Sequence, residues 1–462
     1  MSTQPRAPEA PSAAERRREQ RSWYFYDWAN SAYVTTTATV LFGPYLTVVA
    51  KKAACPDLPS DARCGTDLSV LGFIPVSPGS LALYTVTFAT IVSALVLPVV
   101  GAVVDRSGHK RTIMARFAWL GALAAASMVF VAGDNWQLGV LLQVVASLSL
   151  GCSLVVYDAI LCEIATPDER DGVSSRGWAL GYLGGGLLLA VNLGLLTFAE
   201  DIGVETATAV RVSLLSAGIW WALFTWIPYR GLRDRPPTDL EPAGDGTLVR
   251  QSFVQLGATL RHLRGYPHTL TFLLAYLFFN DGIQTVIVAS SIFGQEELGF
   301  DSSQLVVTIL VVQFVGFFGA LAFGRIAARI GSWRTILAGL VLWCVVVGIG
   351  YFLPEQRFGL FLSLAVLIGL VLGGTQALSR SLYSLLVPKG REAEYFSLYQ
   401  AAERGTSWFG TLLFGLVQQA TDSYRLAIAA LVVFFLVGGV LLARVDVRRG
   451  ILDAGNAVPA VV

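Results

Sequence analysis

The chain has 462 residues, of which 54% are hydrophobic and 14% are charged, and its mean hydropathy is +0.61. Soluble domains carry about 25% charged and roughly 45–50% apolar residues. This composition therefore excludes a soluble globular domain and indicates an integral membrane protein. The formal net charge of +1 gives no indication of a nucleic-acid partner, and we expect none.

The N-terminal region and the first long loop are hydrophilic. Residues 1–22 are rich in Pro, Ala, Glu and Arg and lack the apolar core of a cleavable signal peptide, so we expect a disordered cytoplasmic tail. Cys55 and Cys64 share one loop that we place outside the membrane. The sequence leaves open whether they form a disulfide, because spacing does not supply the required geometry.

Twelve apolar segments are long enough to cross a membrane, since a spanning helix needs about 20 predominantly apolar residues. They lie at residues 23–49, 80–104, 112–132, 137–160, 175–199, 207–228, 267–293, 303–325, 334–353, 358–380, 396–419 and 425–443. The predicted fold class is an all-α membrane protein with twelve transmembrane helices.

A basic, glycine-bounded turn occurs twice, at Gly101–Thr112 and at Gly324–Thr335. Gly, Arg, Gly, Arg and Thr occupy matching positions in the two turns, 223 residues apart. Glycine lets two backbones approach closely, and a repeat at about half the chain length is typical of secondary transporters. We therefore expect two pseudo-symmetric six-helix bundles.

The predicted domains follow from these segments. An N-terminal bundle covers 23–228, a cytoplasmic linker covers 229–266, a C-terminal bundle covers 267–443 and a cytoplasmic C-terminal tail covers 444–462. With both termini inside, 25 of the 33 Lys and Arg residues fall in cytoplasmic segments and six fall in external loops. This distribution agrees with the positive-inside rule.

The topology, the central loop and the Gly-x-x-x-Asp-Arg-x-Gly-x-Lys-Arg turn that begins at Gly101 resemble the major facilitator superfamily. Three further segments, Tyr26–Tyr33, Asn280–Gly282 and Gly374–Ser381, look like signatures of one branch. This is the unknown major facilitator branch, which includes the autophagy-related vacuolar amino-acid effluxers. The resemblance implies export or release of amino acids or similar small polar solutes.

Polar side chains within the apolar segments are functional candidates, because a charge at the centre of a membrane helix costs about 2.5–3.5 kcal/mol or more. Asp281 lies near the middle of the seventh segment, beside Asn280 and three residues before Gln284. A carboxylate that faces a cavity between the halves can exchange a proton or hold an ammonium group. The alternative is a structural carboxylate, fixed by a salt bridge or by a hydrogen bond to a neighbouring helix.

Asp27 and Asn30 share one face of the first segment, three residues apart. They occupy the position that the Asn-Asp pair of the seventh segment occupies in the second half. Two readings remain open: a cavity-facing pair, or hydrated side chains within an aromatic belt at the membrane interface. Asn192 and Gln313 lie at mid-membrane and either line the cavity or hold neighbouring helices together.

Arg380 lies at the cytoplasmic end of the tenth segment, one helical turn after Gln376. A guanidinium group binds carboxylates through two hydrogen bonds, so Arg380 can hold a substrate carboxylate or close a gate. The alternative without a functional role is that the long Arg380 side chain extends to the lipid headgroups. The gate would use charged residues gathered at this end of the helices, which are Asp27, Asp158, Glu163, Glu403 and Arg404.

The aspartate of the first turn, Asp105, is not repeated in the second turn, where Ala328 occupies the matching position. The resemblance implies that Asp105, with Arg106, bridges to the eleventh helix and holds the cytoplasmic side shut, and that Arg111 supports it. A basic loop that merely fixes the topology explains the cations of the turn but not the aspartate.

Other chemistries are poorly supported by the sequence. The three histidines, His109, His262 and His268, are dispersed, so we expect no metal site. No phosphate-binding loop with its lysine is present, and no segment pairs a nucleophile with a spaced base. We expect neither a cofactor nor an enzymatic activity.

The sequence thus predicts a monomeric secondary transporter in the lipid bilayer, which exports a small polar solute of amino-acid type by alternating access with proton coupling. The high Arg-to-Lys ratio favours a bacterial inner membrane. The alternative function is a non-transporting receptor or scaffold that retains the transporter fold. The substrate or proton-coupling candidates are Asp281, Asn280, Gln284, Asp27, Asn30, Asn192, Gln313 and Gln376. The gate candidates are Asp105, Arg106, Arg111, Asp158, Arg380, Glu403 and Arg404.

Overall fold

The computed structural model describes residues 12–57, 64–70, 72–237, 257, 259, 261–405 and 407–462. The first half of the chain contains seven α-helices and a short π-helical segment. These are α1 (Ala13–Ala32), the π-helical segment Tyr33–Leu41, α2 (Phe42–Ala54), α3 (Leu81–Asp105), α4 (Lys110–Ser127), α5 (Trp136–Ile164), α6 (Arg170–Thr197) and α7 (Thr206–Gly231). Single 3-10 turns lie at Pro78–Ser80 and Met128–Phe130.

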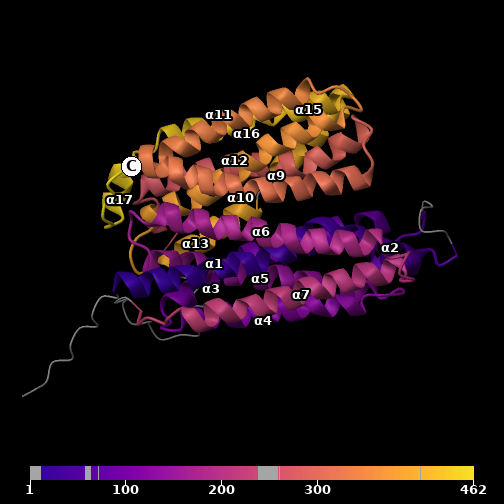
Figure 1. Ribbon diagram of the computed structural model, residues 1–462, viewed down its shortest axis with the longest axis horizontal. Coiled ribbons are helices and arrows are strands. Elements are labelled where there is room, and N and C mark those ends of the chain that lie inside the picture. Colours follow the sequence, from indigo (N-terminus) through magenta and orange to yellow (C-terminus); the bar gives the residue numbers. More distant parts are fainter. Residues whose placement is uncertain are drawn as a thin grey trace, which may run out of the picture.

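The second half begins with four long helices and ends with shorter ones. These are α9 (Pro267–Glu296), α10 (Ser302–Ile330), α11 (Ser332–Tyr351), α12 (Phe358–Leu386), α13 (Glu392–Gly405), α14 (Ser407–Thr421), α15 (Tyr424–Ala430), α16 (Val432–Ala443) and α17 (Val447–Asp453). The helices of the two halves form two layers that lie side by side along the long axis (Figure 1).

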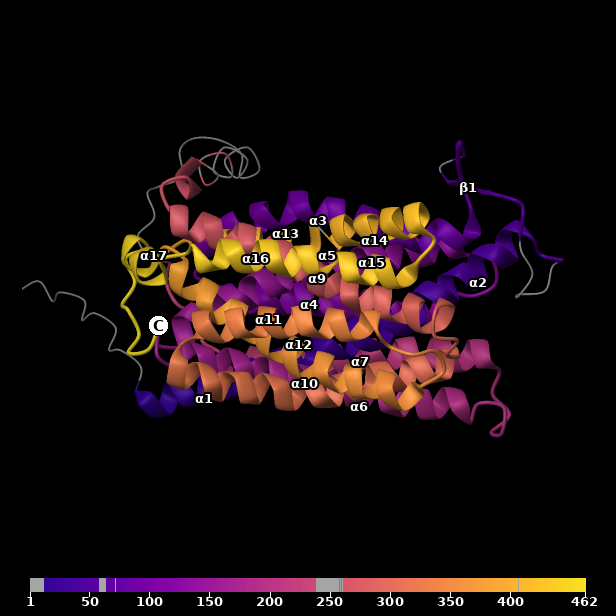
Figure 2. The same ribbon diagram turned by 90° about the horizontal axis from the view of Figure 1, so that it is seen from above.

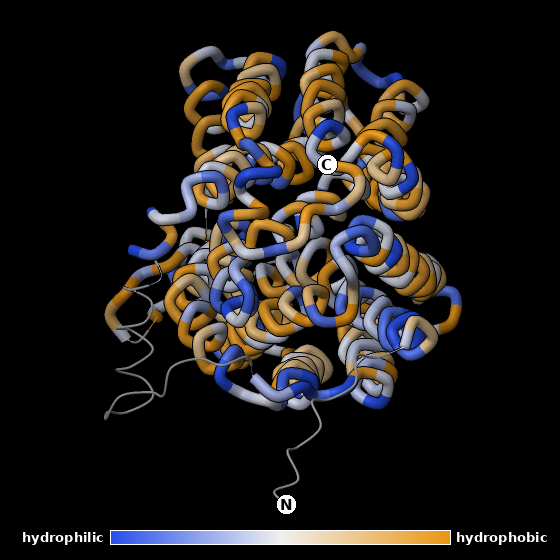
Figure 3. Tube along the Cα trace, turned by 90° about the vertical axis from the view of Figure 1, so that its left-hand side faces the viewer, coloured by the Kyte–Doolittle hydropathy of each residue, from blue (hydrophilic) through white to orange (hydrophobic). Residues whose placement is uncertain are grey.

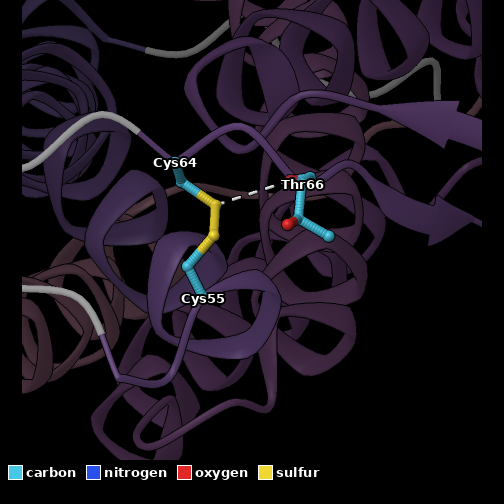
Figure 4. Close-up of a disulfide and its surroundings, with 3 residues drawn as sticks. All are labelled: Cys55, Cys64 and Thr66. Atoms are coloured by element: carbon cyan, nitrogen blue, oxygen red, sulfur yellow. Dashed lines mark hydrogen bonds between the residues drawn. A yellow bond between two sulfur atoms is a disulfide. The ribbon is translucent and has the colours of Figure 1, made fainter.

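Both described ends of the chain lie at the same end of the bundle, where α1 begins and where α17 and the C-terminus lie (Figure 2). We call this the terminal end. The opposite end carries α2 and the strands β1 (Leu68–Val70) and β2 (Ile74–Val76), which pair antiparallel with Leu68 opposite Val76. We call it the disulfide end, because Cys55 and Cys64 are joined there by a disulfide (Figure 4). The structure thus settles the pairing that the sequence left open.

Apolar side chains cover the outer faces of the helices. On α3, Leu83, Phe88, Ile91 and Leu95 are all more than half exposed, and they recur every three to five residues along the helix. Such a stripe is unfavourable in water but suits contact with lipid chains. Figure 3, which looks onto the terminal end, shows apolar residues along the helices, while hydrophilic residues gather at their ends and turns.

Within the described residues, eleven segments are long and apolar enough to span a membrane. The first of them runs unbroken from Ala13 to Ala54 through the π-helical segment. The remaining predicted span, 396–419, is occupied by α13 and α14, which have 14 and 15 residues. The predicted fold class, an all-α multi-span membrane protein, is confirmed.

The first helix begins ten residues earlier than its apolar segment, at Ala13. Ser12 and Glu15 form a capping box, in which each side chain accepts a hydrogen bond from the other's backbone N–H. The prediction of a disordered tail is therefore wrong for residues 13–22, because hydropathy does not detect a polar helix. Residues 1–11 lie outside the described residues, as does most of the predicted linker.

The last residues of the chain form an ordered segment rather than a loose tail. After α17, the Asn456 side-chain amide donates to the carbonyl oxygens of Leu385 and Val387 at 2.8 and 2.7 Å. The backbone N–H of Ala460 donates to Asp168 of the first half at 2.6 Å. The segment therefore contacts both halves at the terminal end.

Close helix packing in the second half depends on glycine. A Cβ atom at Gly373 of α12 would lie 2.3 Å from the carbonyl oxygen of Gly316 of α10, closer than real atoms approach. The two helices can cross at this distance only without side chains at the contact.

Candidate solute cavity and gate

A cavity of about 270 Å³ lies between the two halves. The first half lines it with Ser31 and Thr35 and with the aromatic side chains Trp178 and Tyr182 of α6. The second half lines it with residues of α9, α10, α12 and α13. These include Gln284, Ser290, Ser291, Leu305, Thr308, Gln313, Gln376 and Glu403.

The cavity extends from mid-membrane toward the disulfide end. Glu403 and Gln376 line its inner part, whereas Ser291 and Leu305 belong to the ends of α9 and α10 that lie at the disulfide end. Four of the predicted site residues, Gln284, Gln313, Gln376 and Glu403, are therefore brought together around one space. A mixed aromatic and amide lining of this kind suits a small polar molecule.

Arg380 closes the protein between this cavity and the terminal end. Its Nη2 lies 3.0 Å from Asp27 Oδ2, and its Nη1 lies 3.4 Å from Asp158 Oδ1. Its Nε donates to Ser174 Oγ at 2.9 Å. The side chain is 3% exposed, and its guanidinium lies 4.8 Å from the ring centre of Trp23. Arg380 is thus held by carboxylates of the first half and does not extend to the headgroups.

A second group of hydrogen bonds links this ion cluster to α13. The Gln400 side-chain amide donates to Asp158 Oδ2 at 2.9 Å and to Glu403 Oε2 at 3.3 Å. Arg404 Nε donates to Gln400 Oε1 at 3.4 Å. Glu403 therefore belongs both to the cavity wall and to the network beneath it, which the sequence did not reveal.

Further contacts between the halves lie still closer to the terminal end. Arg170 Nη1 donates to the carbonyl oxygen of Ser384 at 2.7 Å, Ser381 Oγ donates to Asp171 at 2.5 Å, and Ser174 Oγ donates to the carbonyl oxygen of Ala377. Such contacts must break before the halves can separate here. The structure is closed at the terminal end, and its cavity faces the disulfide end.

Asp105 closes the same end on the α3 side. Its carboxylate accepts hydrogen bonds from the backbone N–H groups of Ala393 at 2.9 Å and Glu394 at 2.8 Å, at the start of α13. A carboxylate is favourable at a helix N-terminus because of the unpaired N–H groups and the helix dipole. The residue lies against the eleventh helix, where the resemblance placed it.

The cations that accompany Asp105 differ from those expected. Lys110, which the sequence reading left out of the gate, lies 3.5 Å from Asp105 and 2.8 Å from Glu163. Arg111 instead pairs with Asp234 of the described linker residues at 3.3 Å, so it does not support Asp105 directly. Arg106 makes no ion pair with the described residues. Its Nε also has no hydrogen-bond partner among the described residues, so the expected bridging role of Arg106 is not seen.

Asp281 does not line the cavity, contrary to the cavity-facing expectation. It is 1% exposed, and its Oδ2 accepts a hydrogen bond from the backbone N–H of Gly410 in α14 at 2.9 Å. The adjacent Gly282 lies against Phe434 and Phe435 of α16. The rotation of α9 therefore turns this carboxylate into the second half, toward the first turn of α14.

Three asparagines that were candidates for the solute site form hydrogen bonds within the protein and do not line the cavity. Asn280 accepts a hydrogen bond from Gln376 at 2.8 Å and donates to the carbonyl oxygen of Glu403. Asn30 donates to the carbonyl oxygen of Tyr26 in its own helix. Asn192 accepts from Ser216 of α7 at 3.1 Å, so it fits the helix-joining alternative. Asn30, Asn192 and Asp27 do not line the cavity.

The sequence reading missed the aromatic wall of the cavity. Trp178 and Tyr182 are one turn apart on α6, and their rings lie 5.8 Å apart. The available signal was their spacing of four residues beside the glycine-rich stretch of the same helix, which brings α6 close to α1. Ser174, which binds the Arg380 guanidinium, precedes Trp178 by one turn and was missed as well.

The fold is that of a major facilitator superfamily transporter. It resembles a bacterial homologue of the iron transporter ferroportin in its outward-facing state, with a TM-score of 0.64, 14% identity and coverage of 93% of this chain and 98% of that chain. It also resembles the fucose:proton symporter FucP of E. coli, with a TM-score of 0.66, 11% identity and the same coverage of both chains. At these identities the likeness establishes the fold.

The sequence identifies the family within this class. Residues 15–455 match the family described as vacuole effluxer Atg22 like. The MFS-type transporter YxiO of Bacillus subtilis (strain 168) is 31% identical, over 92% of this chain and 94% of the relative. Autophagy-related protein 22-1 of Phaeosphaeria nodorum (strain SN15) is 25% identical, over 98% and 94%. The chain belongs to the Atg22-like family of MFS transporters and is not an enzyme.

Proposed function

We propose that this transporter exports small zwitterionic solutes of the amino-acid class from the cytoplasm of a bacterium, in exchange for protons. The terminal end then faces the cytoplasm, in agreement with the excess of Lys and Arg in the segments assigned to that side. The two bundles, 23–228 and 267–443, rock as units about the cavity.

The observation that carries this proposal is the position of Glu403, a carboxylate that lines the cavity and also contacts the network around Arg380. A carboxylate in this position can hold the ammonium group of a solute or a proton, but not both at once. Gln284, Gln313 and Gln376 offer amide groups for the carboxylate of the same solute. Competition between solute and proton at one group is sufficient for exchange.

Loading of the solute from the cytoplasm requires the gate at the terminal end to open. Arg380 would leave Asp27 and Asp158, and the contacts of Arg170 and Ser381 would break at the same time. A bound solute stabilises the conformation to which it binds more tightly. Its binding therefore shifts the equilibrium between the states with the terminal end open and closed. In this scheme Asp281, which lies away from the cavity, serves the structure of α14 and not the coupling.

The proposal is tested with the purified protein in liposomes, using a panel of labelled amino acids with and without a pH gradient. We expect gradient-driven uptake into acidic-inside vesicles by the intact protein. Glu403→Gln should lose at least about tenfold of the gradient-driven rate, and solute exchange without a gradient should weaken too, because the carboxylate that holds the ammonium group is gone. Glu296→Gln, an exposed carboxylate of α9 outside the cavity, is the matched control.

Two results would contradict the proposal. If no amino acid is transported at all by the folded protein, the solute class is wrong. If Glu403→Gln retains gradient-driven uptake and Asp281→Asn loses it, the coupling carboxylate is Asp281 in spite of its position.

A further inference from the structure

The first membrane span is not α-helical throughout. Between α1 and α2, nine residues, Tyr33–Leu41, form a π-helix, in which each backbone N–H binds the carbonyl oxygen five residues back instead of four. In this register the N–H of Phe42 donates to the carbonyl oxygen of Thr37. Turns of this kind are rare, are mostly single and often lie at functional sites, so a run of nine residues calls for a physical explanation.

The π-helical segment forms part of the cavity wall. Val34, Thr35 and Thr39 line the cavity, and the Thr35 hydroxyl accepts a hydrogen bond from the side-chain amide of Gln313 in α10. Thr35 is 3% exposed and packs against α6, where a Cβ at Gly185 would lie 2.5 Å from its Oγ1. The segment is thus held between the two halves, and any movement of α10 relative to α6 changes its contacts.

Two buried hydroxyls of the π-helical segment lack a partner. Thr36 and Thr37 are both 0% exposed, and neither Oγ1 makes a hydrogen bond with the described residues. Burying a polar group without a partner costs free energy, because the group has lost its hydrogen bonds to water and gained none in return. The two hydroxyls therefore destabilise the conformation that the segment adopts here.

The π register accounts for these unpaired hydroxyls. In an α-helix, a threonine hydroxyl can donate to the carbonyl oxygen four residues back, as that of Thr47 does in α2 at 3.1 Å. Within the segment, the hydroxyl of Thr39 instead donates to a carbonyl oxygen five residues back, that of Val34, at 2.9 Å. Thr36 and Thr37 lie close to the change from the α to the π register and reach neither kind of acceptor.

A return to the α register would pair both hydroxyls, because the carbonyl oxygens of Ala32 and Tyr33 would then lie at the usual acceptor position. Helix α2 can keep its place during this change. The Tyr45 hydroxyl fixes it to the first half through a hydrogen bond to the carbonyl oxygen of Val131 at 2.6 Å, and the outer part of the segment can take up the extra residue. The change therefore rotates side chains of the cavity wall without moving the ends of the span.

We propose that the π-helical segment is a register switch, which is π-helical at Thr36 and Thr37 while the disulfide end is open and becomes α-helical there when that end closes. The hydrogen bond from Gln313 stabilises the open arrangement, and the two unpaired hydroxyls destabilise it. Opposing contributions of this kind make a two-state element, whose equilibrium the movement of the halves shifts. The inference rests on the alternate opening of the two ends, and not on the solute or the coupling ion.

Replacing the two hydroxyls by methyl groups tests the switch. Thr36→Val combined with Thr37→Val removes the unpaired hydroxyls of the π register and the hydrogen bonds of the α register, so both effects favour the open disulfide end. Spin labels at Phe198 and Phe352, which are exposed at that end, report its opening in the full-length protein, with the free cysteines changed to serine, in phosphatidylcholine nanodiscs without solute. The background is Arg380→Gln, because loss of this gate contact should populate both arrangements.

In the double valine variant, we expect the ratio of the long to the short distance to rise about fivefold or more, the lower range of typical coupling within proteins. Thr39→Val is the matched control in the same segment. Its hydroxyl finds a backbone carbonyl in either register, so this substitution should change the ratio by less than about twofold. Gln313→Leu should lower the ratio, because it removes the hydrogen bond that stabilises the open arrangement.

Thermal unfolding of the double valine variant gives a second test that needs no spin label. Its melting temperature should rise, because two unpaired buried hydroxyls are gone; a fall would show that the hydroxyls have partners and would overturn the proposal. An unchanged ratio in this variant, or an equal change in Thr39→Val, would overturn it as well. A single distance in the Arg380→Gln background would contradict the alternate opening itself, and with it this inference.

Discussion

The contacts of α3 with α13 and of α10 with α6 use the same glycine spacing but different chemistry. In each, a glycine lets one helix approach the first turn of another, at Ala393 and at Asp171. In the first contact Asp105 then binds that turn through two hydrogen bonds, whereas Ala328 leaves the second turn open. The comparison teaches that glycine sets the distance between helices and that the charge four residues later decides how firmly the contact is held.

The glycines provide the largest expected effect. Gly101→Ala places a methyl group against the Ala393 backbone carbonyl, which cannot rotate away, and overpacking of this kind costs about 1–3 kcal/mol. Gly324→Ala meets the hydroxyl of Ser175, a side chain that can rotate, so its cost should be smaller. Thermal unfolding of the purified variants in detergent measures both.

Gly194→Ala is the control for this pair, because a Cβ there would meet nothing within 4 Å. It should be neutral or stabilising by up to about 1 kcal/mol, since alanine favours helix formation over glycine. Equal destabilisation by Gly101→Ala and Gly324→Ala would show that the two contacts do not differ in the way described.

Asp105→Asn tests how much the carboxylate contributes to the difference between the two contacts. The variant keeps the size of the side chain and one acceptor oxygen, but it loses the negative charge and the acceptor of the second hydrogen bond; a hydrogen bond to a charged group contributes about 1.5–3 kcal/mol. Cys162 is a free cysteine that lies beside the Ser384 carbonyl oxygen of the other half. The terminal end should open more often, and the rate of maleimide labelling at Cys162 should rise about tenfold or more. Ala328→Asn, at the matching position of the other contact, should change the rate by less than about twofold. Equal rates in the two variants would refute the role given to Asp105.

The smallest expected effect concerns pH at the start of α6. Burial raises the pKa of Glu169, but hydrogen bonds from Thr166 and the nearby Arg16 outweigh burial, so the pKa lies below its ordinary value. A carboxylate with a lowered pKa adds stability above the unfolded-state pKa of about 4.3 and loses it as the pH falls through the folded-state value. The melting temperatures of the protein and of Glu169→Gln should therefore converge under acidic conditions. A difference that grows on acidification would contradict this assignment.

The architecture could be predicted from the sequence, because a helix that spans a lipid bilayer needs about 20 predominantly apolar residues. Apolar length predicts the spans, and the repeated turn at Gly101 and Gly324 predicts two halves. The loss of the aspartate at Ala328 was also visible in the sequence, although the contact of α10 with the start of α6 was not. The polar start of α1 was not accessible through hydropathy, since its capping box at Ser12 and Glu15 contributes no apolar signal.

The candidate site was only partly accessible, because helix rotation is set by packing and not by position along the chain. Asp281 and Gln284 are three residues apart, yet Gln284 lines the cavity and Asp281 binds α14. Arg380 was expected to hold a substrate carboxylate, to close a gate or to reach the headgroups, and the fold brings it to Asp27 and Asp158. Glu403 was assigned to the gate alone, since nothing in the sequence indicates that α13 also borders the cavity.

The central claim is that the two ends of the molecule open in alternation, and distances measured at both ends test it most directly. Spin labels at Arg18 and Arg329 report on the terminal end, and labels at Phe198 and Phe352 report on the disulfide end; all four positions are exposed. Pulsed electron spin resonance on Arg380→Gln should then show a longer distance at the terminal end and a shorter distance at the disulfide end. Distances that stay unchanged, or that move in the same direction at both ends, would contradict the account.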